Sequence, residues 1–144
     1  MNSSISTAGV STNAAKLFKE LIMGYRSDVA YVVKFESIEK RDAYVALCLA
    51  KNDPFITSAI EEDCVYDNKE DPIITFKATD VKWYQDFPDV KAHQFIYTQA
   101  RELDMGGYRF VAVGEDGTED YDEEDMDFDL SDYICAVHRL ETSF

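Results

Sequence analysis

The sequence predicts one α+β domain whose core has the element order β-α-β-β-α-β, the split arrangement of ferredoxin-like folds. Two apolar periodicities carry this prediction: a two-residue alternation typical of strands and a four-residue spacing typical of helices. The chain has 144 residues and 46% hydrophobic content, which is enough to bury one core without disulfides or metals. One further helix is expected before this core, and one further strand after it.

The N-terminal part of the chain changes character twice. Residues 1–12 are rich in Ser and Thr and lack periodicity, so we expect a flexible arm ahead of a single domain that spans residues 13–144. A helix is expected from about Asn13 to Tyr25, because apolar residues recur there at four-residue spacing. From Asp28 to Glu36 the apolar residues alternate, which predicts the first strand of the core.

Signals for a helix and then a hairpin follow. Ser37 is placed to cap a helix that reaches about Asn52, and the following Asp-Pro pair ends it. The stretch 55–63 is compatible with a loop or with a short helical turn. A short strand at Cys64–Tyr66 and a longer one at Pro72–Ala78 flank a polar turn, which predicts a hairpin.

The last part of the predicted core begins at Pro88. This proline suits the first position of a helix, and apolar residues follow it at four-residue spacing. Gly106-Gly107 would end that helix. Tyr108–Val113 and Tyr133–Leu140 are predicted strands, and we expect them to form a hairpin whose long acidic tip is the segment 115–132.

Charge is concentrated in this segment. The net charge of the chain is −15, from 29 acidic and 14 basic residues. Eleven acids and no Lys or Arg lie in residues 115–132, so the remaining chain has 18 acids against 14 bases, a net charge of only −4. We predict that this segment binds a partner through its carboxylates and two aromatic side chains. The predicted partner-binding residues are Glu115, Asp116, Glu119, Asp120, Asp122, Glu123, Glu124, Asp125, Asp127, Asp129, Asp132, Tyr121 and Phe128.

Several chemical functions lack their sequence signals. The chain has no phosphate-binding glycine loop, nucleophile elbow or zinc signature, so we predict no enzyme, no cofactor and no metal centre. Cys135 and His138 would point to opposite faces of a strand, which argues against a catalytic pair. A calcium loop that starts at Asp125 has Leu130 where Gly is required and Ala136 where Glu is required. A looser, weak divalent-cation site stays open.

Nucleic acids and membranes are disfavoured as direct ligands. Phosphate binding requires clustered Lys and Arg, but these residues are scattered here and the net charge has the opposite sign. No run approaches the length of about eighteen apolar residues that a membrane span requires, and the start of the chain lacks an apolar signal core. We therefore expect a cytoplasmic protein.

The acidic segment divides into two parts. Residues 119–124 have the pattern of solvated like charge, which usually stays disordered. In residues 125–130, Asp alternates with Met, Phe and Leu, which predicts an ordered strand with carboxylates along one edge at ~6.6 Å spacing. That edge would have about half the charge density of one DNA strand. Closer imitation would require compact folding, a homodimer or the additional acids Glu61, Glu62, Asp63, Asp67, Glu70 and Asp71.

In its size, its acidity and the stretch 114-GEDGTEDYDEEDMDFDLSD-132, the chain resembles the small acidic inhibitor proteins that bacteriophages encode. These include DNA mimics, antirestriction proteins and some anti-CRISPR proteins. The resemblance lies in this stretch alone. It implies that the partner is a host-defence protein with a nucleic-acid-binding groove, and that the chain acts in the cytoplasm of the host cell.

The leading hypothesis is therefore a stoichiometric inhibitor that occupies the basic groove of a nucleic-acid-binding protein. The carboxylates would steer the chain to the groove and form ion pairs. Affinity usually also requires apolar anchors, and the acidic segment and its end offer four. These are Tyr121, Met126, Phe128 and Tyr133.

Two alternatives belong to other classes. The chain could be a general protein-interaction or regulatory module in which the acidic segment only adds solubility. It could also be a small ligand-binding domain or enzyme with an aromatic pocket formed by Trp83, Tyr84, His93 and Tyr97. The sequence leaves open the identity of the partner and the oligomeric state.

Overall fold

The computed structural model describes residues 24–137 and 139–144, and side chains are described outside residues 135–139. The predicted flexible arm at 1–12 lies outside the described residues. So does the helix expected from Asn13 to Tyr25, apart from its last two positions, Gly24 and Tyr25, which are not helical.

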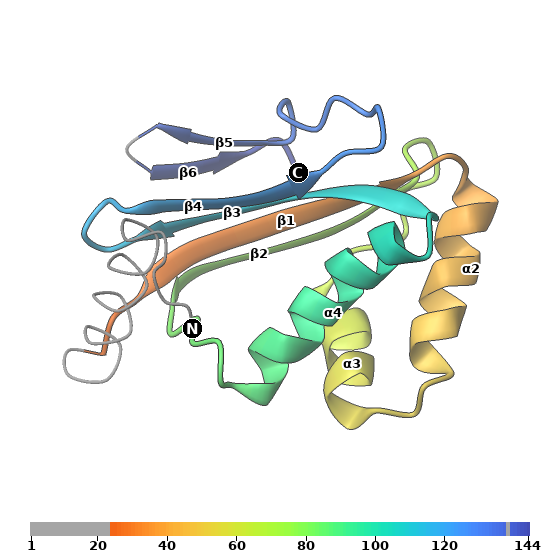
Figure 1. Ribbon diagram of the computed structural model, residues 1–144, viewed down its shortest axis with the longest axis horizontal. Coiled ribbons are helices and arrows are strands. Elements are labelled where there is room, and N and C mark those ends of the chain that lie inside the picture. Colours follow the sequence, from red (N-terminus) through yellow and green to blue (C-terminus); the bar gives the residue numbers. More distant parts are fainter. Residues whose placement is uncertain (1–23, 138) are drawn as a thin grey trace, which may run out of the picture.

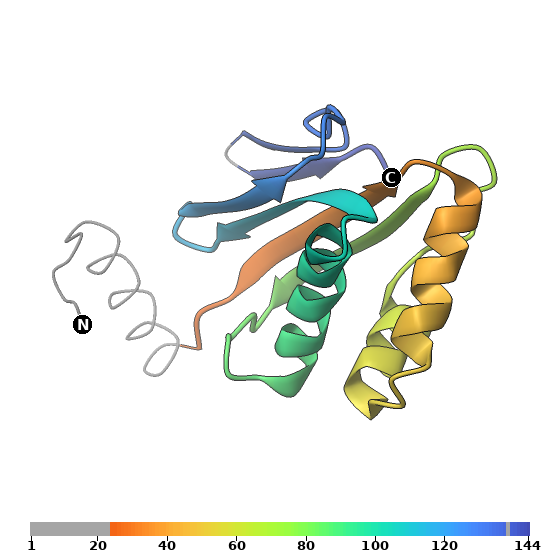
Figure 2. The ribbon, with the colours of Figure 1, turned by 45° about the vertical axis from the view of Figure 1, so that its right-hand side comes forward.

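The described chain has an α+β fold with one main sheet (Figure 1). Helices α2, α3 and α4 cover one face of the sheet, and a two-stranded hairpin, β5 and β6, lies over the other face (Figures 1 and 2). The sheet is antiparallel, in the order β2-β1-β3-β4. The strands are β1 (Ser27–Phe35), β2 (Ile73–Val81), β3 (Gly106–Gly114), β4 (Glu119–Glu124), β5 (Ile134–Val137) and β6 (Arg139–Thr142).

β1 lies at the centre of the structure because both of its faces are buried. Val29, Tyr31 and Val33 face the helices and belong to the larger core. Ala30 and Val32 face the hairpin and belong to a second, smaller core. The predicted strand and its apolar face are confirmed, and the hairpin gives the opposite face a core of its own.

Capping residues set the starts of the first two helices. Ser37 caps α2 (Ile38–Leu49) with its side-chain oxygen, as predicted. Asp53 caps α3 (Pro54–Ser58), whose first residue is a proline. A π-helical turn, η1 (Ala59–Asp63), follows directly, so the stretch that the sequence left open is helical.

The third helix, α4 (Pro88–Glu102), begins at a proline as predicted, but it ends before the two glycines. Gly106 and Gly107 are instead the first residues of β3, so the prediction that they end the helix is wrong. A Cβ atom at Gly107 would lie 2.4 Å from the carbonyl oxygen of Asp125, and one at Gly106 would lie 2.8 Å from that of Lys34. Glycine is required here because neighbouring backbones approach too closely for a side chain.

The predicted ferredoxin-like strand order is not found. The strand expected at 64–66 is reduced to a single antiparallel bridge between Val65 and Thr75, because η1 carries the preceding residues away from the sheet. At the opposite edge, β4 extends the sheet beyond β3. The α+β class is confirmed, whereas the arrangement of the strands differs from the prediction.

The hairpin predicted between Tyr108–Val113 and Tyr133–Leu140 is also wrong. β3 pairs with β4, and the tip of their hairpin is the short turn at residues 115–118. The C-terminal strands β5 and β6 pair with each other instead. Leu130, which is fully buried, draws the connecting chain over the hairpin-side face of the sheet.

Candidate functional site

Five of the predicted carboxylates lie on β4, the edge strand next to β3. They belong to Glu119, Asp120, Asp122, Glu123 and Glu124, and all except the half-buried Asp120 are exposed. The expectation that residues 119–124 are disordered is wrong. Backbone pairing holds them along β3 from Val113 to Tyr108, and this pairing requires no apolar side chains.

The β4 carboxylates project to both sides of the sheet, because successive side chains of a strand alternate. Asp120, Asp122 and Glu124 lie opposite Ala112, Phe110 and Tyr108, whose side chains belong to the helix-side core. Glu119 and Glu123 lie on the hairpin side together with Tyr121. A partner that enclosed this edge would therefore contact carboxylates on both faces of β4.

Arg109 anchors the hairpin side of β4. Its Nη1 forms an ion pair with Glu123 at 3.0 Å, and its Nε donates a hydrogen bond to the carbonyl oxygen of Ile134 at 3.1 Å. Its guanidinium carbon also lies 5.2 Å from the centre of the Tyr121 ring. One half-buried cation thus links β3, β4 and β5.

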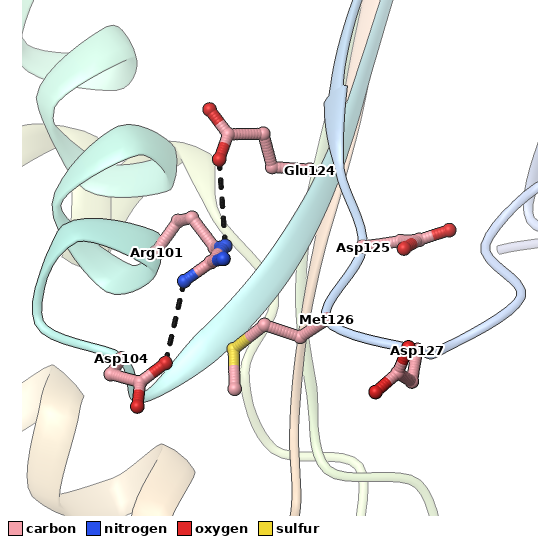
Figure 3. A pocket seen from close by; sticks show the side chains of 6 residues that line it. All are labelled: Arg101, Asp104, Glu124, Asp125, Met126 and Asp127. Carbon is pink, nitrogen blue, oxygen red and sulfur yellow. Dashed lines mark hydrogen bonds and ion pairs between the residues drawn. The ribbon is translucent and has the colours of Figure 1, made fainter.

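On the helix side of β4, a tyrosine hydroxyl and a second arginine contact the carboxylates. The Tyr108 hydroxyl donates a hydrogen bond to Asp122 at 2.8 Å, and burial together with this carboxylate raises the pKa of Tyr108. Arg101 of α4 lies 3.5 Å from Glu124 and 3.3 Å from Asp104 (Figure 3). Side chains of β3 and α4 therefore hold three of the β4 carboxylates in place.

A surface hollow of about 490 Å³ lies where β4 ends. Its walls are Arg101, Asp104, Glu124, Asp125, Met126 and Asp127. Figure 3 shows the Met126 side chain on the Arg101 side of the hollow and the Asp125 carboxylate turned away from Arg101. Met126 and Asp127 have φ values of 50° and 70°, so the chain turns here. The ordered strand predicted for residues 125–130 is therefore wrong.

Residues 128–133 attach the acidic segment to the hairpin-side face by apolar contacts. Phe128 and Tyr133 are half-buried against the smaller core that contains Leu130. The Lys34 ammonium donates a hydrogen bond to the Tyr133 hydroxyl at 3.0 Å and lies 3.3 Å from Asp71, and the bond to Tyr133 raises the pKa of Lys34. The Tyr133 hydroxyl in turn donates to Asp71. Asp125, Asp127, Asp129 and Asp132 remain exposed around this anchored stretch.

The two predicted carboxylates at the hairpin tip have a different setting. Glu115 and Asp116 are exposed, and Asp116 accepts hydrogen bonds from the Tyr25 hydroxyl at 2.6 Å and from the Thr118 amide at 3.1 Å. Burial of the Tyr25 hydroxyl, reinforced by Asp116, raises the pKa of Tyr25. Asp116 thus shapes the turn and connects it to Tyr25, two residues before the start of β1.

Three of the four residues proposed for a ligand pocket are part of the helix-side core instead, whereas Tyr84 is half-buried with its ring 4.9 Å from that of Phe87. Trp83, His93 and Tyr97 are buried there, and His93 is only 1% exposed. His93 Nδ1 lies 2.7 Å from the Tyr31 hydroxyl, and its Nε2 lies 2.8 Å from Asp63. Burial lowers the pKa of His93, and the nearby Asp63 opposes that shift. This arrangement has the character of a satisfied core histidine.

Sequence reasoning missed the three cations that hold the acidic segment, Lys34, Arg101 and Arg109. The signal for two of them was present. Lys34 lies between Val33 and Phe35, and Arg109 between Tyr108 and Phe110, so each interrupts an apolar strand with a charge that needs a partner. Arg101 lies on a helix and offered no comparable signal.

The described part of the chain contains no candidate metal site and no candidate membrane-crossing helix. Within it, no group of three or more His, Cys, Asp or Glu residues is arranged to hold a metal ion. No helix among those residues is long and apolar enough to cross a membrane. Comparison with models of known families, with curated proteins and with solved structures finds no match to this chain.

Proposed function

We propose that this chain is a stoichiometric inhibitor that places its acidic edge, residues 119–129, in the basic groove of a nucleic-acid-binding protein. The observation that carries the proposal is the density of carboxylates on β4. Five acids in six residues, at ~3.3 Å per residue, give about one charge per 4 Å when both sides are counted. One DNA strand has a charge every ~3.4 Å.

This density changes the sequence-based estimate. The estimate of half the charge density of a DNA strand assumed that residues 125–129 form an extended strand. In the structure, these residues turn instead. β4 supplies about 1.7 times that density of carboxylates on a fixed backbone. Arg101 and Arg109 each form an ion pair with one glutamate, so three charges over about 20 Å stay uncompensated, about half the density of one DNA strand. The edge therefore matches one strand more closely than a duplex.

Apolar contacts next to the carboxylates would supply affinity beyond electrostatic steering. Tyr121 is 46% exposed and lies within the row of acids, so it is the strongest anchor. Met126, Phe128 and Tyr133 are each half-buried, and part of their surface is used by the fold itself. Of the four predicted anchors, Tyr121 has most area left for a partner.

The resemblance to phage-encoded acidic inhibitors suggests which kind of protein the partner is. The partner would be a host-defence protein that binds nucleic acid, such as a restriction or CRISPR effector, and the inhibitor would act in the host cytoplasm. A second copy of the chain would enlarge the acidic surface.

The test is competition for DNA with two charge-matched variants. The edge variant combines Glu119→Gln, Asp122→Asn, Asp125→Asn, Asp127→Asn and Asp129→Asn. The control variant changes five exposed acids elsewhere: Glu36→Gln, Glu39→Gln, Asp86→Asn, Glu102→Gln and Glu141→Gln. Both variants lose the same charge, so total charge cannot explain a difference between them.

Purified nucleic-acid-binding defence proteins, each loaded with a fluorescently labelled duplex, would be titrated with each form of the chain. We expect wild type and the control variant to displace the duplex, and the edge variant to lose about 2–3 kcal/mol of affinity, roughly a hundredfold. Equal displacement by both variants would contradict the proposal. Residual activity of a chain lacking residues 119–129 would favour the general interaction module instead.

A further inference from the structure

β4 offers a partner main-chain groups as well as carboxylates. Among the described strands, it has a neighbour only on its β3 side. The Gly114 amide donates to the Thr118 carbonyl at 2.8 Å, and this bond fixes the phase of the β3–β4 ladder. Asp122 then turns its N–H and C=O groups toward β3, whereas Glu119 and Glu123 turn theirs to the outer edge.

We propose that the partner adds an extended segment to the outer edge of β4, and that this segment has Lys or Arg at alternating positions. The inference rests on the proposed function and specifies how the same edge is recognised. Main-chain hydrogen bonds would supply register and affinity, and alternating cations would supply specificity. The partner is thus recognised as a strand and not only as a basic surface.

Charge decides which strand can occupy this edge. A second copy of β4 would place Glu and Asp directly opposite Glu and Asp, and such like-charge pairs are destabilising. A strand with Lys or Arg at alternating positions would instead place cations opposite the acids on one face of the sheet. The acidic side chains therefore exclude self-association along this edge and admit a strand of opposite charge.

The opposite edge of the sheet is less open. Val65 and Thr75 exchange two backbone hydrogen bonds of 2.9 Å on the outer side of β2. Strand addition is accordingly assigned to β4.

The two arginines beside β4 leave room for an incoming cation. Arg109 approaches Glu123 from β3, and Arg101 approaches Glu124 from α4, so both lie on the inner side of the strand. An added strand would reach the same carboxylates from the outer side. Each glutamate has two oxygens and can accept hydrogen bonds from both directions.

The first measurement uses a synthetic peptide of about ten residues in which Arg and Thr alternate, a length that covers β4. Amide hydrogen exchange of the wild-type chain is followed by NMR with and without the peptide. We expect the Glu119 and Glu123 amides to exchange at least about tenfold more slowly in the complex. The Asp122 amide, already bonded to β3, should change little. Peptide binding without protection at Glu119 and Glu123, or no binding at low salt, would overturn the inference.

The second measurement compares Glu123→Pro with Glu123→Gln. Both remove the carboxylate, but only proline removes the outward N–H, and an edge position tolerates proline. We expect Glu123→Pro to bind the peptide about tenfold more weakly than Glu123→Gln. If the two bind equally while the edge variant does not bind, strand addition is wrong and the proposed function stands. If the edge variant also binds like wild type, the proposed function fails as well. The exchange measurement decides the question if Glu123→Pro does not fold.

Discussion

Two parts of the acidic segment, a first half at residues 119–124 and a second half at 125–132, are similar in charge but are attached to the fold by different contacts. The first half has no apolar side chain except Tyr121, and backbone pairing with β3 fixes it. The second half turns away from the sheet edge and is fixed by Leu130 and its neighbours in the hairpin-side core. The difference teaches that the pattern of apolar residues predicts burial, whereas an available neighbouring strand decides whether a charged segment is ordered.

The largest expected effect separates these two kinds of attachment. Leu130→Ala removes a fully buried side chain from the smaller core and should lower the free energy of unfolding by about 2–4 kcal/mol. Chemical denaturation with urea measures this loss. Asp129→Ala, on the exposed neighbouring position, serves as the control and should change stability by less than about 0.5 kcal/mol. A similar small effect for both would mean that the second half is not packed on the sheet.

The next effect compares the two arginines that approach β4. Arg109→Gln should cost about 1–2 kcal/mol, because it removes a half-buried ion pair and the donor to the Ile134 carbonyl oxygen. Arg101→Gln should cost under about 1 kcal/mol, because its ion pairs are more exposed. Thermal and urea unfolding of the two variants gives the ranking. The reverse order would show that Arg109 is not the anchor of this edge.

The pH dependence of stability should report on His93, whose side chain is buried in the helix-side core, and not on the exposed acidic edge. Burial lowers the pKa of His93 in the folded chain below its unfolded value, so the unfolded chain takes up the proton first as pH falls. The His93 contribution to stability is therefore complete above the unfolded value and declines as pH drops below it. We expect the free energy of unfolding of wild type to fall more between neutral and mildly acidic pH than that of His93→Gln. Parallel pH profiles would contradict this assignment.

The smallest expected effect on stability belongs to the edge variant. Its five carboxylates are exposed, and removing like charges relieves repulsion, so the free energy of unfolding should stay within about 0.5 kcal/mol of wild type or rise slightly. Thermal unfolding measures it. A large loss would mean that these carboxylates are needed for folding, and a binding defect of the variant would then have a trivial cause.

Much of the fold could be predicted because local signals agreed with the final packing. Ser37 and Pro88 mark the starts of two helices correctly, and the alternation around Tyr31 marks the central strand. The acidic segment was singled out from its charge alone. Its internal order was predicted in reverse. Alternation at 125–130 is visible in the sequence, whereas the pairing of 119–124 depends on β3 having one side open to a further strand, which the acidic residues do not encode.

Strand order failed for a similar reason. The residues at 64–66 favour a strand, but the preceding π-helical turn leaves only Val65 in position to bridge to β2. Gly106 and Gly107 carry the usual signal for the end of a helix, and their actual role is a close approach between backbones that no local pattern reveals. Pairing and close approach are long-range properties, and a single sequence encodes them only indirectly.

The central claim, that function lies in the carboxylates of the acidic edge, is tested most directly by the salt dependence of partner binding. The dissociation constant for a nucleic-acid-binding partner would be measured between about 50 and 200 mM salt for wild type, the edge variant and the charge-matched control variant. We predict the same steep weakening with salt for wild type and the control variant, and a clearly shallower dependence with weaker binding for the edge variant. Identical salt dependence for the edge and control variants would contradict the claim.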